Sequence, residues 1–201
     1  MNLLRWSSLL ALLFWLVAAT GCARSPKVTF YTLEPAAGTP PAASGPVQST
    51  IAVGAITLPE VVDRQQLVVR GDGSRVVILE MHRWGGPLKS EIPRLLAENL
   101  RRLLGTDRVS ADPQNAGRDA DIRVLVDIQR FEAIPGESVT VDAFWTIRST
   151  AGGASKTGRS LVREPVRGTG YDAIVAAYSR ALGVVSTDIA RAVRSDSFPS
   201  H

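Results

Sequence analysis

The 201-residue chain has few of the residues that cross-link small proteins or catalyse reactions. Its single cysteine, Cys22, excludes a disulfide framework within the chain. Only two histidines are present, His82 and His201, and no cluster of His, Cys, Asp and Glu has the spacing of a metal site. We therefore expect no catalytic residue, no metal ligand and no cofactor.

Two patterns could still suggest chemistry. His82 would be the base of a hydrolase, but no Gly-x-Ser-x-Gly segment supplies a nucleophile, so we interpret it as a surface or hydrogen-bonded residue at a strand-to-helix turn. The segment Gly152-Gly153-Ala154-Ser155-Lys156-Thr157 resembles a phosphate loop, but Ser155 stands where a glycine is required. A hairpin turn explains it better.

A long basic block is also absent. The formal charge is +4, or +3 without Arg5, and the high pI of about 9.7 comes from scattered arginines. Nucleic acid is therefore not an expected partner. The positive charge could bring the domain near anionic lipid headgroups or an acidic partner, although we prefer a solvated face.

The N-terminus has the pattern of an export signal. Residues 1–21 contain Arg5 followed by the apolar run Leu9 to Ala19, which is too short for a lasting membrane span. The closing Ala19-Thr20-Gly21-Cys22 resembles the lipobox of bacterial lipoproteins, with Ala19 where leucine is commoner. This resemblance implies that Cys22 is acylated, and Ala23 in place of aspartate implies the periplasmic face of the outer membrane. The alternative is an ordinary signal peptide with a chance cysteine.

Removal of residues 1–21 leaves 180 residues, which is enough for one domain and a tether. We divide them into a lipidated N-terminus with a first short strand and a Pro/Ala-rich linker at 22–49, a domain at 50–195, and a disordered polar tail at 196–201.

Alternating apolar residues and turn signals predict the strands and helices. Strands are expected at 27–33, 51–58, 66–70, 75–79, 122–128, 139–147 and 155–164, of which the last three form an antiparallel meander. Residues 107–119 read as a polar, turn-rich segment. Leucines at helical spacing predict an amphipathic helix that begins at a Ser90 cap and ends at Gly105, with Pro93 in its first turn. A second helix, capped by Asp172, carries Ile174, Tyr178, Leu182, Val185, Ile189 and Val193.

The segment between the hairpin and the first helix is the centre of this organisation. We expect Trp84, Pro87 and Leu88 to form a structural corner that sets the angle of the helix, and Trp145 to lie in the core. For Trp84 a partner contact is an equal alternative. Candidate partner-binding residues are Arg83 and Trp84 in this corner, together with Arg94 and Arg101 on the polar side of the helix.

Several short motifs occur in a recognisable order, namely Phe30-Tyr31-Thr32-Leu33, Leu58-Pro59 before Asp63-Arg64-Gln65, Trp84-x-x-Pro87-Leu88, Val141-x-x-x-Trp145 and Gly170-Tyr171-Asp172. With the lipobox they make the chain similar to the PqiC-like family of ABC-transport auxiliary lipoproteins. The resemblance implies an α/β fold, a single domain with a mixed β-sheet and helices packed on it.

The resemblance also implies partners. These are an MCE-domain (PqiB-like) periplasmic subunit with its inner-membrane partner, and the outer membrane through the lipidated cysteine, with room for a homo-oligomer. The implied role is non-catalytic docking in a complex that moves phospholipid between membranes. The alternative is a stand-alone envelope lipoprotein that binds a small apolar ligand or stabilises the envelope. A neighbouring gene for an MCE protein would separate the two.

We predict that Cys22 is the acylation site, because small residues precede it where the apolar run of the signal ends. Cells labelled with a palmitate analogue should yield labelled wild-type protein and unlabelled Cys22→Ser protein. Equal labelling of the two would contradict the prediction.

Overall fold

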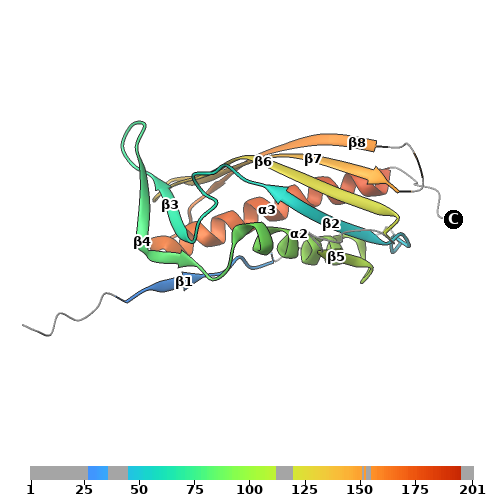
Figure 1. The fold of residues 1–201 in the computed structure, drawn as a ribbon, viewed down its shortest axis with the longest axis horizontal. Helices are drawn as coiled ribbons and strands as arrows, with labels where there is room; N and C mark the ends of the chain where they lie inside the picture. Colours follow the sequence, from blue (N-terminus) through green and yellow to red (C-terminus); the bar gives the residue numbers. More distant parts are fainter. Residues whose placement is uncertain (1–26, 36–44, 112–119, 151, 153–154, 196–201) are drawn as a thin grey trace, which may run out of the picture.

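The computed structural model describes residues 27–35, 45–111, 120–150, 152 and 155–195 (Figure 1). The signal segment, Cys22, most of the Pro/Ala-rich linker and the tail at 196–201 lie outside these ranges. The predictions made for them are therefore not tested by the structure.

The larger sheet has five strands in the order β5-β2-β6-β7-β8. β2 (Ile51–Thr57) pairs in parallel with β5 (Val109–Ala111) and β6 (Ile122–Ile134), and β6, β7 (Ser138–Ser149) and β8 (Ser155–Pro165) form the antiparallel meander. The mixed sheet and the meander were both predicted correctly. β5 was missed, because only three residues of a polar segment form it.

A second, three-stranded sheet has the order β1-β4-β3. β3 (Gln66–Arg70) and β4 (Val76–Trp84) form the predicted hairpin, and β1 (Thr29–Tyr31) pairs in parallel with the end of β4. The sequence indicated one sheet, and it ended β4 at Leu79. β4 instead continues to Trp84, so His82 and Trp84 are strand residues and not part of a loop.

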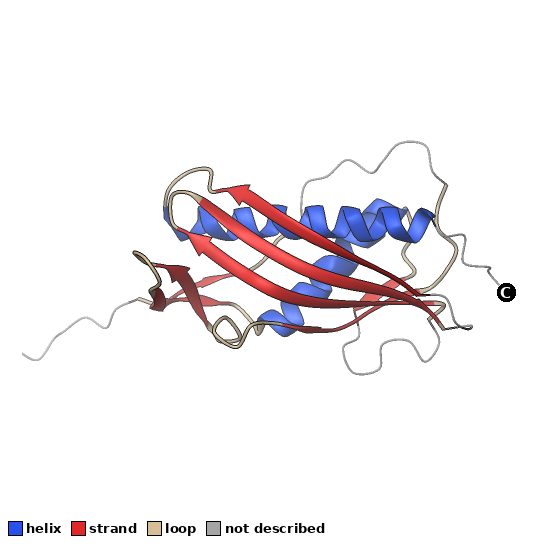
Figure 2. Cartoon of the chain, turned by 90° about the horizontal axis from the view of Figure 1, so that it is seen from above, coloured by secondary structure: helices blue, strands red, loops and turns tan. Residues whose placement is uncertain are grey.

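α2 (Leu88–Leu104) and α3 (Gly170–Ser195) cover one face of the five-stranded sheet, and Figure 2 looks onto the opposite, open face. The predicted leucine stripe of α2 is buried, and Gly105 ends the helix in the left-handed conformation at φ 66°. Between the helices, the buried Asn99 donates a hydrogen bond to Ser186. The amphipathic packing that the sequence predicted is confirmed.

The helix starts differ from the prediction. α2 begins at Leu88, two residues before the expected Ser90 cap, and Pro87 precedes it without a side-chain cap. The amides of Ser90 and Glu91 both donate to the Pro87 carbonyl. Pro93 therefore lies beyond the first turn, where it removes one helical hydrogen bond. In α3 the helix begins at Gly170, and Asp172 lies in its first turn instead of capping it.

Trp145 is buried, as expected, and links the sheet to α3. Its ring covers Gly158 on β8, where an added Cβ would lie 2.1 Å from Cζ2 of the tryptophan. The indole donates to Ser160 Oγ at 3.1 Å, and the Ser160 hydroxyl donates to Asp188 on α3 at 2.7 Å. Trp145 of β7, Ser160 of β8 and Asp188 of α3 therefore form one hydrogen-bonded chain that joins the sheet to the helix.

Leu95→Ala should lower the free energy of unfolding by ~2–5 kcal/mol, because Leu95 is buried and its loss leaves a cavity under the sheet. Arg94→Ala should cost ~0.5 kcal/mol or less, since the Arg94 side chain is 69% exposed and pairs with Glu91 on the same helix. Chemical denaturation measures both. If Leu95→Ala unfolds like the wild type, α2 does not pack as described.

Candidate functional site

The first strand of the described chain is fastened to the domain by a cluster of three aromatic side chains. The Tyr31 hydroxyl lies 2.8 Å from Nδ1 of His82 on β4. On its other side, His82 contacts Tyr171 at the start of α3, with ring centroids 4.2 Å apart. The cluster therefore joins β1, β4 and α3 at the point where the chain from the N-terminus enters the fold.

A second aromatic cluster lies deeper at the same place. Phe131 of β6 stacks on Tyr178 of α3 with centroids 3.9 Å apart and planes 4° from parallel. Trp84, the last residue of β4, packs against both rings at 6.2 to 6.4 Å. Trp84 is only 5% exposed, so its packing supports the role of structural corner and leaves no indole surface for a partner.

The environment of Tyr31 opposes its use as a nucleophile or base. Burial, followed by the nearby Asp172 and Tyr171, raises the pKa of the Tyr31 hydroxyl. The phenol therefore stays protonated and can donate to His82 Nδ1, which then serves as an acceptor. Burial likewise raises the pKa of Tyr178. These groups act as structural hydrogen-bonding and packing groups.

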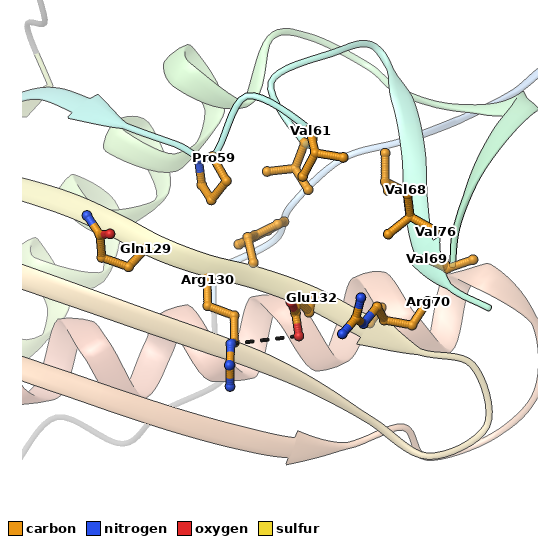
Figure 3. Close-up of a pocket in the computed structure, with 12 residues that line it drawn as sticks. Pro59, Val61, Val68, Val69, Arg70, Val76, Gln129, Arg130 and Glu132 are labelled. Carbon is orange, nitrogen blue, oxygen red and sulfur yellow. Dashed lines mark ion pairs between the residues drawn. The ribbon is translucent and has the colours of Figure 1, made fainter. Parts of the chain in front are cut away.

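An apolar pocket lies between the β3–β4 hairpin and β6 (Figure 3). Its volume is about 90 Å³, and its apolar lining consists of Pro59, Val61, Val62, Val68, Val69, Val76, Phe131 and Ala133. Arg70, Gln129, Arg130 and Glu132 complete it, with Arg130 and Glu132 3.7 Å apart. The pocket volume is smaller than the ~150 Å³ of an apolar cavity that holds benzene, so the pocket has room for only a few methylene groups.

A larger groove of about 500 Å³ runs between β1 and α3. Phe30, Tyr31 and Thr32 line one side, and Asp172, Ser179 and Arg180 line the other. The Glu34 amide donates to Ser179 Oγ at 3.1 Å across the groove. Its lining is about equally polar and apolar, as expected of an open surface groove.

The four candidate partner-binding residues do not come together. Arg83 lies on β4 opposite Phe30, and its guanidinium donates to the Glu80 carbonyl. Arg94 is exposed on α2. Arg101 is only half-exposed, because it donates to both Glu98 and the Val109 carbonyl. The second of these acceptors belongs to β5, the strand that the sequence analysis missed.

The sequence reasoning overlooked an exposed apolar surface on the hairpin. Val76, Val77 and Ile78 follow one another in β4 and are all exposed, and Val61 is exposed beside the pocket. Three consecutive apolar residues that follow a turn indicate a strand with apolar side chains on both faces. That signal was present in the sequence and was taken only as evidence for a hairpin.

Within the described ranges, no three His, Cys, Asp or Glu side chains lie close enough to hold a metal ion. One helix in those ranges, α3, is long and apolar enough to cross a membrane. However, 61% of its most apolar window is buried against the rest of the domain, which is the pattern of a core helix.

The chain was compared with known proteins. A family model described as ABC-type transport auxiliary lipoprotein component matches residues 31–190. A crystal structure of an uncharacterized protein and that of a Xanthomonas campestris protein both align with 18% identity and a TM-score of 0.67. They cover 83% and 81% of this chain, and 99% and 93% of their own. At this identity the similarity shows the fold alone. A comparison with curated proteins gives no match.

We predict that Tyr31→Phe lowers the free energy of unfolding by about 1 kcal/mol, because it removes the hydrogen bond to His82 and keeps the ring. Tyr171→Phe is the matched control. Its ring also contacts His82, but its hydroxyl has no hydrogen bond to any residue that the structure describes, so it should cost less than about 0.5 kcal/mol. Chemical denaturation compares them, and equal effects would show that the hydroxyl of Tyr31 contributes nothing.

Proposed function

Because the chain belongs to the family of ABC-type transport auxiliary lipoprotein components, we propose that it is the lipoprotein subunit of an MCE-type complex that moves phospholipid between membranes. In this proposal, Cys22 anchors the protein to the periplasmic face of the outer membrane. Its partner is the PqiB-like MCE subunit, which in turn joins an inner-membrane protein. Family membership is the observation that carries the proposal.

The proposed role is docking, without catalysis. Tyr31 and His82 are the groups closest to an acid–base pair, and the raised pKa of Tyr31 supports a structural use. The apolar pocket of about 90 Å³ is far below the ~300–1,000 Å³ of sites that enclose small molecules. The groove of about 500 Å³ between β1 and α3 is large enough, but it is open and carries Glu34, Asp172 and Arg180 in its lining, unlike an apolar lipid site. Both observations support a subunit that positions a conduit, and not one that carries lipid in its own interior.

We assign the docking surface to the polar face of α2. This face carries Glu91, Arg94, Glu98, Arg101 and Arg102, and every one of these residues takes part in an ion pair. Arg94 has the most exposed side chain of the three arginines, at 69%. Exposed charges of this kind contribute little to folding, which leaves them available to steer and orient a partner.

Arg94→Glu should therefore reduce co-purification with the MCE subunit by roughly tenfold. Reversing one exposed charge at an interface is expected to weaken binding by ~1.4 kcal/mol, and this free energy corresponds to a tenfold change in affinity. Arg191→Glu is the matched control. Arg191 lies on α3, is 72% exposed and pairs with Asp188 three residues earlier, as Arg94 pairs with Glu91. Pull-down from detergent-solubilised membranes, with melting curves for both variants, makes the comparison.

Two results would count against this assignment. If both variants retain the MCE subunit fully, the polar face of α2 is not the docking surface. If the correctly folded wild type does not co-purify with an MCE subunit at all, the transport role itself is wrong.

A further inference from the structure

The outer part of the β3–β4 hairpin is a two-sided apolar projection. Val76, Val77 and Ile78 are 44%, 44% and 37% exposed. Neighbouring residues of a strand point to opposite faces, so β4 has partly exposed apolar side chains on both faces here, although Val69, the cross-strand partner of Val77, is buried. Figure 1 shows the hairpin at one end of the molecule, with its turn projecting beyond the rest of the fold. The turn beyond these residues is polar, with Asp72 and Arg75 in an exposed ion pair, so the two valines and the isoleucine form an apolar band behind a charged tip.

The chain enters the fold at the same end of the molecule. β1 pairs with the end of β4, with Thr29 opposite His82, and both views place β1 and the hairpin together (Figures 1 and 2). Phe30, next to Thr29, is 63% exposed and is the most exposed large apolar residue in the described part of the chain. One end of the domain therefore presents apolar side chains from two separate segments.

The length of chain before β1 decides what this end faces. Thr29 is seven positions after Cys22, and a fully extended chain of seven steps spans at most ~25 Å. His82 is six positions after Val76, which is roughly 20 Å along a strand. An acylated Cys22 thus keeps Thr29 within about one hairpin length of the bilayer surface.

We propose that the hairpin end, Val76 to Ile78, together with Phe30, is a second membrane contact, inserted at the headgroup level of the leaflet that holds the acyl chains of Cys22. The inference rests on the acylation in the proposed function. It adds a defined orientation, with the apolar end of the domain on the bilayer and α2 along its flank. Apolar side chains partition into this boundary region of a bilayer.

The low net charge of this end of the domain also agrees with a membrane contact made by apolar side chains. Residues 27–33 and 60–84 contain five Lys and Arg and four Asp and Glu, so this end has almost no net charge. Attraction to anionic headgroups is therefore weak, and burial of the apolar side chains supplies the contact. The contact should then persist at high salt, unlike a polybasic one.

The lone cysteine makes the test direct, because an acylated Cys22 leaves no other thiol. Val77→Cys and Phe30→Cys, each labelled with an environment-sensitive fluorophore, are reconstituted as full acylated protein in phosphatidylethanolamine–phosphatidylglycerol vesicles. Val184→Cys is the matched control, since Val184 is 40% exposed on α3, thirteen residues beyond Tyr171. Spin-labelled lipids should quench the labels at 77 and 30 several-fold more than the label at 184, at low and high salt alike.

Vesicle flotation of the same samples separates the possible failures. Protein that floats but shows equal quenching at 77 and 184 keeps the anchor and overturns the membrane contact. Self-quenching between labels at 77 without lipid quenching overturns it in favour of contact between two copies. Wild-type protein that does not float lacks the anchor, and the membrane contact falls with it.

Discussion

The packing of Trp84 against the stacked Phe131 and Tyr178 is the interaction on which the rest of the structure depends. Each ring belongs to a different part of the fold, namely the small sheet, the large sheet and α3. Aromatic side chains bury large apolar areas, so these three contribute much of the contact between those parts. β1 pairs with β4, and the Trp84 ring at the end of β4 packs on the large sheet and α3. The first strand of the described chain is therefore linked to the large sheet through these three rings.

Much of the fold could be predicted where a local pattern and the tertiary environment agree. The alternation in β6 and β7 matches a sheet with one face under helices, and the leucines of α2 match the buried side of a helix. Gly105 could be recognised as a helix end because a left-handed residue favours glycine. The hydrophobic seam of α3 was likewise visible at helical spacing. In these elements each buried position requires an apolar residue, so the pattern of burial can be read from the sequence.

The rest depends on contacts that local sequence does not encode. β4 runs past Leu79 because its end is paired with β1, which lies more than fifty residues earlier. β5 forms because the edge of β2 is available for pairing. Its Val109 carbonyl accepts a hydrogen bond from Arg101, which the helical periodicity of α2 could not reveal. α2 starts at Leu88, earlier than predicted, because the Pro87 carbonyl and not a side chain accepts the hydrogen bonds of the Ser90 and Glu91 amides. Phe131 lies beyond the predicted strand at 122–128 and Tyr178 lies on the predicted second helix, so their stacking follows only from the assembled fold.

The parallel pairing of β1 with β4 has a mechanical consequence. A pulling force directed along the axis of β1 loads the evenly spaced, slanted hydrogen bonds that join β1 to β4 mainly in shear. All of these bonds then bear the load together in shear, and the Tyr31–His82 bond shares it. An antiparallel strand entering from the other side would be peeled away one bond at a time. The short β1 can therefore resist tension that its three residues would not withstand in an unzipping geometry.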